Sequence, residues 1–181
     1  MTEDLALPTP TAQPIAGGVW FEPAHPDPAG AALAFFERLD ARRRRAILWD
    51  VPDEDKVPFL EGQLEAAEVS GFAWVGNTPA AFAWGNPSCK GSRTLAAHFS
   101  FCQTCPPEYR ERIGHAFLAE CAVSFRQIAC MLPVQWAGAI VWLKRLGFEE
   151  AARFKGGCRI EHQNRNLDGV LLVYDLAKVK R

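Results

Sequence analysis

The stretch GAIVWLKRLGFEEA, residues 138–151, decides the fold. Its apolar residues recur at the spacing of one helical face, which predicts an amphipathic helix; they are Ala139, Trp142, Leu143 and Leu146. Gly147 follows as the expected left-handed cap of that helix, and Phe148 begins a strand. A helix that ends at a glycine before a strand is common, so its meaning depends on the elements around it.

Composition predicts one globular domain without a large charged surface. The chain has 181 residues, of which 49% are hydrophobic and 23% charged, with a formal net charge of −1. That balance argues against a nucleic-acid partner, because binding to phosphate backbones needs accumulated positive charge. No apolar run approaches the roughly 18 residues of a membrane span, and the proline-broken start does not resemble a signal peptide. We therefore expect a cytoplasmic protein with no membrane partner.

The six cysteines are expected to be reduced thiols, because a chain of this length does not need disulfides. Cys102 and Cys105 form a CxxC pair, which is found both in zinc sites and in redox centres. A zinc site would need further ligands, and only Cys89, His98 and His115 are near in sequence. We expect no metal and incidental thiols, with zinc and redox chemistry as the alternatives.

Hydrophobic patterns divide the chain into a flexible arm at residues 1–16 and a single domain at residues 17–181. Strands are predicted at 18–23, 71–75, 80–85, 94–101, 128–132, from 148, and at 170–176; helices are predicted from 28, from 57, at 108–126 and at 138–146. The basic run at 42–45 is expected to be a solvated helix end, and Asp168–Gly169 to be the turn before the last strand.

The resulting order is β-α-α-β-β-β-α-β-α-β-β. An antiparallel meander followed by a parallel crossover predicts an α+β fold, with a mixed sheet and helices on both of its faces.

That order and two local patterns resemble the GNAT N-acetyltransferase superfamily. In the family's phosphate-binding pattern, Arg or Gln is followed three residues later by Gly and then by Gly or Ala. The segment ERIGHAFLAEC is similar, with Glu111, Gly114 and Ala116 at those positions. Glu111 departs from the family's Arg or Gln, and a carboxylate beside a pyrophosphate is unfavourable.

The second pattern is the opening stretch, which resembles a family segment running from Asn-x-x-Ala to Gly-Phe. Ala139, Gly147 and Phe148 match it. Trp136 stands at the usual Asn position, and Leu143 stands where many members carry a Tyr proposed to protonate the departing thiolate. The amino-acid sequence of this segment most resembles that of divergent acetyltransferase-like proteins encoded by tailed bacteriophages.

The resemblance implies a mostly antiparallel sheet with one splayed parallel strand pair, and an acyl-coenzyme-A-dependent N-acyltransferase. It implies acetyl-coenzyme A as the cofactor and a small-molecule or peptide amine as the acceptor, and it leaves a homodimer open. The residues implied at the cofactor are Phe101 and Cys102 for the acyl–pantetheine arm, Arg112, Ile113, Gly114, His115 and Ala116 for the pyrophosphate, and Gln135, Ala139 and Leu143 on the far side.

His98 is the candidate general base. Strand alternation places it on the face of Ser100 and Cys102, and its ordinary pKa suits proton transfer near neutral pH. The alternative is a histidine that is hydrogen-bonded within a half-polar strand.

A second hypothesis follows from the departures at Glu111, Trp136 and Leu143, which favour a domain that has lost catalysis and acts as a coenzyme-A-binding or assembly module. The acidic residues near 50–55, Glu61 and Glu65 would attract a cationic amine or form a solvated surface.

Overall fold

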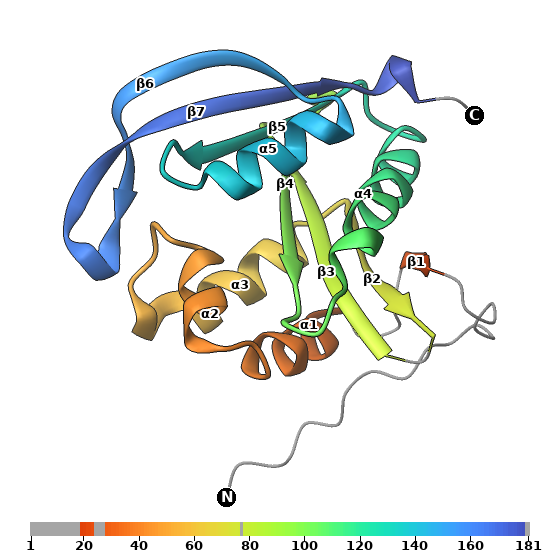
Figure 1. The fold of residues 1–181 in the computed structure, drawn as a ribbon, viewed down its shortest axis with the longest axis horizontal. Helices are drawn as coiled ribbons and strands as arrows, with labels where there is room; N and C mark the ends of the chain where they lie inside the picture. The colour runs from red at the N-terminus through yellow and green to blue at the C-terminus, as the bar shows by residue number, and fades with distance from the viewer. Residues whose placement is uncertain (1–18, 24–27, 77, 180–181) are drawn as a thin grey trace, which may run out of the picture.

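The computed structural model describes residues 19–23, 28–76 and 78–179. Within these residues, seven strands form one sheet in the order β1-β2-β3-β4-β5-β7-β6, in which only β4 and β5 run parallel (Figure 1). The predicted mixed sheet with a single parallel pair is therefore confirmed. The predicted arm at residues 1–16 lies outside the described residues.

The first half of the sheet is the predicted antiparallel meander. It consists of β1 (Val19–Pro23), β2 (Val69–Val75), β3 (Thr78–Pro87) and β4 (Thr94–Phe101). Apolar and aromatic side chains fill β2 and β3, and most of them are buried. This pattern is typical of strands that are covered on both faces.

Three helices connect β1 to β2, where the sequence predicted two. They are α1 (Pro28–Glu37), α2 (Ala41–Ala46) and α3 (Lys56–Glu65). The basic run forms α2 instead of ending α1, because the Asp40 side chain caps a new helix by accepting a hydrogen bond from the Arg43 N–H at 2.8 Å. No residue of α2 is buried, so the prediction that this run is solvated is confirmed.

The second half of the sheet consists of β5 (Gln127–Pro133), β6 (Glu149–Ile160) and β7 (Arg165–Asp175). Two helices connect its strands: α4 (Pro107–Cys121) precedes β5, and α5 (Ala137–Leu146) follows it. Gly147 adopts the expected left-handed conformation, with φ of 102°, and its N–H caps α5 by bonding to the carbonyls of Leu143 and Lys144. The segment that decides the fold is therefore placed as its sequence predicts.

The turn between the last two strands differs from the prediction. β7 already begins at Arg165, and the chain reverses at Glu161–Gln163 (η2) and at Asn164, whose φ is 47°. Gly169 lies inside β7, where a Cβ atom would come within 2.8 Å of the Cys158 sulfur. The glycine at 169 thus permits close packing and does not form a turn.

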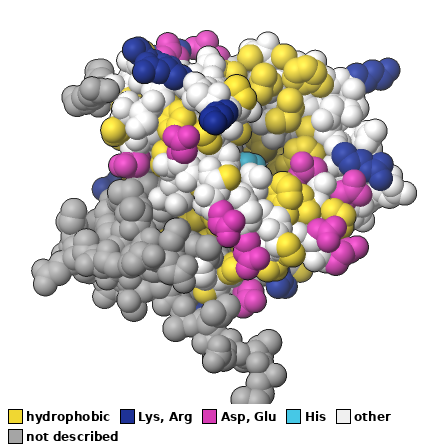
Figure 2. All heavy atoms as spheres, turned by 180° about the vertical axis from the view of Figure 1, so that it is seen from behind, with side chains coloured by type: hydrophobic (Ala, Val, Ile, Leu, Met, Phe, Trp, Pro, Cys, Tyr) yellow, Lys and Arg dark blue, Asp and Glu magenta, His cyan; other side chains and the backbone are white. Residues whose placement is uncertain are grey.

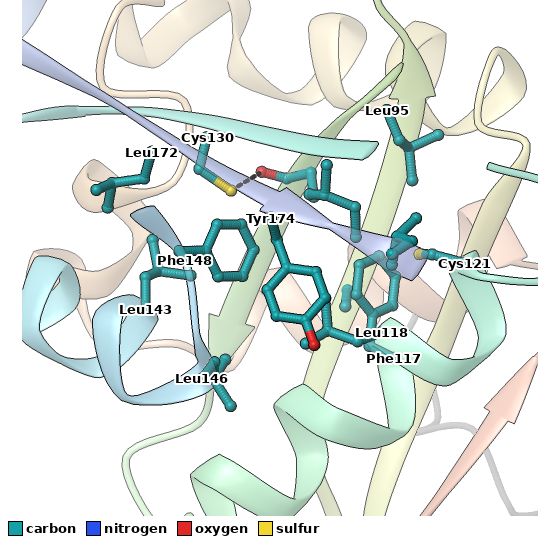
Figure 3. Close-up of a cluster of buried hydrophobic side chains, with 14 of the residues drawn as sticks. Leu95, Phe117, Leu118, Cys121, Cys130, Leu143, Leu146, Phe148, Leu172 and Tyr174 are labelled. Carbon is teal, nitrogen blue, oxygen red and sulfur yellow. Dashed lines mark hydrogen bonds between the residues drawn. The ribbon is translucent and has the colours of Figure 1, made fainter. Parts of the chain in front are cut away.

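Two main hydrophobic clusters lie on the sheet. One joins α1 and α3 to side chains of β2 and β3. The other joins α4 and α5 to β4, β5 and β7, and Figure 3 shows its centre around Phe148 and Tyr174. Within the described residues, no helix is long and apolar enough to cross a membrane.

Candidate active site

The parallel pair β4–β5 opens after three residue pairs. Thr94, Leu95 and Ala96 face Gln127, Ile128 and Ala129, and the ladder then stops although both strands continue. At the point of divergence the Cys130 thiol donates to the Ala97 carbonyl at 3.5 Å, as the dashed line in Figure 3 shows. The second half of β4, Ala97–Phe101, therefore pairs by backbone ladder with β3 alone, and the bond from the Cys130 side chain links it to β5.

Backbone alternation decides which groups of β4 face this opening. The Ala97 carbonyl points toward β5, so the N–H and C=O groups of Phe99 and Phe101 point the same way. Cys102 has the opposite orientation: its N–H donates to the Ala80 carbonyl at 2.9 Å, and its carbonyl accepts from the Cys105 N–H at 3.2 Å. Phe101 thus turns its backbone groups toward the opening, whereas the N–H of Cys102 is already used.

An aromatic wall stands beside the opening. The Trp142 ring of α5 makes edge-to-face contacts with Phe99 and Phe101, each with ring centroids 5.1 Å apart. Phe99 also contacts Phe117 of α4 at 4.9 Å. Trp142 therefore occupies space between α5 and the second half of β4.

Gly114 allows α4 and α5 to approach closely. A Cβ atom at this position would come within 2.5 Å of a Leu146 methyl carbon and 3.1 Å of the Trp142 ring. In this structure the glycine of the phosphate-like pattern thus has a helix-packing role.

The remaining residues of that pattern lie in the second and third turns of α4. Ile113 is fully buried, Arg112 and His115 are exposed, and Ala116 is half-buried. Glu111 is exposed and approaches Arg145 of α5 at 3.8 Å. Its carboxylate therefore takes part in a surface ion pair between the two helices.

The first turn of α4 has few free amide donors. Pro106 and Pro107 carry no N–H, and the Tyr109 N–H already donates to the Pro106 carbonyl at 3.1 Å. Glu108 adds a negative charge to the same turn. Successive backbone N–H groups, which bind phosphate at other helix starts, are thus largely missing here.

Arg110 is a cationic side chain beside the end of β4. Its guanidinium lies over the Phe101 ring at 5.6 Å and donates to the Cys105 carbonyl at 3.3 Å. Its Nε is buried and has no hydrogen-bond partner among the described residues. An unpaired buried donor on a cation is costly, so this atom is suited to an anionic ligand.

The far wall was predicted to include Gln135, Ala139 and Leu143. Gln135 is exposed and accepts a hydrogen bond from Arg165 at 3.4 Å, and Ala139 is half-buried in the first turn of α5. Leu143 is only 3% exposed and belongs to the core beside Phe148 (Figure 3). The structure thus places Leu143 in the core, and it places Ala139 at the start of α5 with its side chain half-buried.

His98 lies on the opposite face of β4 from the aromatic wall. Its ring stacks on that of Trp84, its partner in β3, with centroids 4.7 Å apart and planes 8° apart. Burial lowers the pKa of His98 to about 4. The ring is therefore neutral at pH 7, so one of its nitrogens carries a lone pair, although it is a weaker base than an exposed histidine.

Ser100, which the sequence analysis did not select as a functional residue, is the next side chain on the same face. It is 5% exposed, and its hydroxyl has no hydrogen-bond partner in the described part of the chain. The indole N–H of Trp84 is also buried and has no hydrogen-bond partner in that part of the chain. Figure 2 shows a hollow on one face of the molecule, with a histidine at its floor and hydrophobic side chains around it. Neutral polar groups within apolar surroundings are typical of small-molecule sites.

Comparison with solved structures identifies this arrangement. A spermidine N-acetyltransferase from Vibrio cholerae, solved with coenzyme A and spermine, superposes with a TM-score of 0.70 at 10% identity, covering 89% of this chain and 97% of that one. The chain has the GNAT fold. A GNAT-family acetyltransferase from Streptococcus pneumoniae gives 0.64 at 14% identity, with 87% and 99% covered. Mycobacterium smegmatis RimJ, solved with a coenzyme A disulfide, gives 0.68 at 13%, with 92% and 86% covered.

No protein-family model and no curated protein matches the sequence. The structural likeness therefore shows the fold, and the activity has to be argued from the site.

Proposed function

We propose that the protein is an acyl-coenzyme-A-dependent N-acyltransferase that transfers an acetyl group to a primary amine on a small molecule or peptide. The observation that carries the proposal is the opening of β4 from β5 after Ala96, which turns the backbone groups of Phe99 and Phe101 toward unoccupied ladder positions. Proteins of the same fold have been solved with acetyl-coenzyme A, among them YncA from Salmonella typhimurium. We include the phage-type branch in this proposal on the sequence of residues 139–148.

The residues present suit the phosphate and amide groups of coenzyme A only in part. Phe99 and Phe101 offer a strand edge to the amides of the pantetheine arm, and Arg110 offers a buried, unpaired Nε to an anion. Bound acetyl-coenzyme A would supply an activated acyl thioester. A strand edge would hold that thioester in a fixed orientation, which favours transfer to an aligned amine.

His98 would accept the proton that the amine loses. It is neutral at pH 7, and its side chain is on the half of β4 that has separated from β5. Because its pKa is near 4, it removes a proton efficiently only as the nitrogen becomes positively charged during transfer. Ser100 and Trp84 offer two further unpaired polar groups for orienting the acceptor.

Calorimetric titration with acetyl-coenzyme A tests the proposal directly. We expect binding by the wild-type protein and an affinity about tenfold lower for Arg110→Gln, since a hydrogen bond to a charged group is lost. Arg126→Gln is the matched control, because Arg126 is an exposed arginine just before β5 and outside the implied cofactor residues, and its affinity should change less than threefold. If no heat of binding is detected at millimolar acetyl-coenzyme A, the proposal is contradicted.

A second function is favoured by specific observations: a coenzyme-A-binding or assembly module without catalysis. Trp142 fills space beside the opening, and two prolines remove amide donors at the start of α4. Release of free thiol from acetyl-coenzyme A in the presence of a broad amine panel separates the two functions. Binding without amine-dependent thiol release favours the module, and turnover with any amine favours the transferase.

A further inference from the structure

Cys102 and Cys105 form a compact turn at the end of β4. The Cys105 N–H donates to the Cys102 carbonyl at 3.2 Å, which is the hydrogen bond that closes a four-residue turn. The first and last Cα atoms of such a turn lie within about 7 Å, and disulfides span about 4.4–6.8 Å between Cα atoms. The turn therefore holds the two Cα atoms at a separation that a disulfide can span.

The two thiols differ in access. Cys102 is half-buried, and its sulfur lies 3.1 Å from the Thr104 hydroxyl, whereas Cys105 is only 2% exposed and its thiol donates to the Pro106 carbonyl at 3.7 Å. An accessible cysteine followed by a buried one is the arrangement in which the first attacks an external disulfide and the second resolves it.

We infer that Cys102 and Cys105 are a redox-active dithiol that a low-molecular-weight disulfide, such as oxidised glutathione, converts to an internal disulfide. The Cys102 thiolate attacks one glutathione sulfur, forms a mixed disulfide and releases one glutathione thiolate. The Cys105 thiolate then attacks the Cys102 sulfur and releases the second glutathione. The protein loses two protons and two electrons, and the glutathione disulfide is reduced to two thiols.

The surroundings make the second step the slower one. Burial is the largest cause that raises the pKa of Cys105, and it still acts once Cys102 carries glutathione, so little Cys105 thiolate forms at neutral pH. The neighbouring Cys102 also raises this pKa, but only while it is a free thiol. Arg110, which donates to the Cys105 carbonyl, acts in the opposite direction. The mixed disulfide on Cys102 should therefore accumulate near pH 7 and resolve faster as the pH rises.

The other cysteines do not offer an equivalent partner. Cys121, Cys130 and Cys158 are buried, and burial raises the pKa of Cys130 to about 12. Cys89 is exposed, but it precedes β4 while Cys102 follows it. The eight residues of that strand separate the two ends by about 25 Å.

The disulfide would act locally. It closes a loop of only four residues, which stabilises the folded chain little compared with a long loop. It would fix the turn between Phe101, whose backbone borders the opening, and Arg110, which touches both Phe101 and Cys105. The inference concerns the thiols themselves and does not depend on the proposed transferase activity.

Thiol trapping in glutathione buffers tests the inference. The full-length protein is equilibrated at increasing ratios of oxidised to reduced glutathione, quenched with acid, alkylated with a maleimide and mapped by mass spectrometry. We expect two of the six thiols to become protected, with one peptide cross-link between residues 102 and 105, and full recovery after dithiothreitol. Six reactive thiols at every ratio, or a cross-link to Cys89, would overturn the inference.

Single variants separate the two steps. Cys105→Ser should retain glutathione on Cys102, Cys102→Ser should form no internal disulfide, and the exposed Cys89→Ser should behave as the wild type. Because a serine at the buried position can unfold the chain, Cys105→Ala serves as the second variant for the first step. Absence of the glutathione adduct in a folded Cys105→Ala protein would contradict the proposed attack by Cys102.

Discussion

The two halves of strand β4 have different partners and different chemistry. The first half, Thr94–Ala96, is hydrogen-bonded to both β3 and β5, and Leu95 at its centre is fully buried. The second half, Ala97–Phe101, does not pair with the β5 backbone, and it carries His98 and the unpaired hydroxyl of Ser100. One strand thus holds the sheet together at one end and borders the candidate site at the other.

The difference shows why polar groups are tolerated in the second half. A buried hydroxyl without a partner costs free energy in a packed sheet. In the first half, by contrast, the one polar side chain is bonded, because the Thr94 hydroxyl donates to the Gln127 side-chain oxygen at 3.3 Å. Just before the strand, the Ser92 hydroxyl accepts from the Thr94 N–H at 3.0 Å. We therefore expect mutations in the first half to change stability most, and mutations in the second half to change binding.

The largest effect is expected at Leu95. Leu95→Ala removes a fully buried side chain from the main core and should lower the free energy of unfolding by about 3–5 kcal/mol. Leu132→Ala is the matched control, since Leu132 on β5 is only partly buried against the same cluster, and it should cost less than half as much. Urea unfolding measures both. A loss below about 1 kcal/mol at Leu95 would show that the first half is not the anchor of the sheet.

A smaller effect is expected from the titration of His98. Its pKa is about 4 in the folded protein and 6.5 when unperturbed, so the unfolded chain binds more protons between these values. The free energy of unfolding should therefore decrease by up to about 3 kcal/mol as the pH falls through this window.

Urea unfolding from pH 7 to pH 4 measures this dependence. His98→Gln should remove this contribution, and His115→Gln, at an exposed position on α4, should keep the wild-type dependence. Equal slopes for wild type and His98→Gln would mean that burial does not hold His98 neutral in the folded protein.

Local sequence patterns were sufficient to predict α5 with its cap and the side-chain faces of β4. Helical spacing and a glycine suffice to place α5 and its cap at Gly147, because a left-handed residue is needed there whatever surrounds it. Alternation likewise suffices to place His98 and Ser100 on one face of β4.

Contacts distant in sequence could not be predicted. Gly114 matches a phosphate-binding pattern, yet the space that its missing side chain leaves is taken by Leu146 and Trp142 from another helix. Gly169 has turn chemistry, yet it lies in a strand against Cys158. A glycine in the sequence indicates that its position needs either close packing or a backbone conformation that other residues rarely adopt. Only the folded structure shows which neighbouring atoms occupy the space.

The smallest effect, and the one most specific to the second half of β4, is expected at Ser100. Ser100→Ala removes a buried hydroxyl that has no partner among the described residues, so the folded protein should gain about 1 kcal/mol. The control is Ser92→Ala at the other end of the strand, where the hydroxyl is bonded to the Thr94 backbone and its loss should cost about 1 kcal/mol. Changes of opposite sign in the free energy of unfolding of the two variants, measured by urea unfolding, would support the contrast between the two halves of β4. If Ser100→Ala is instead destabilised, its hydroxyl is satisfied and does not await a ligand.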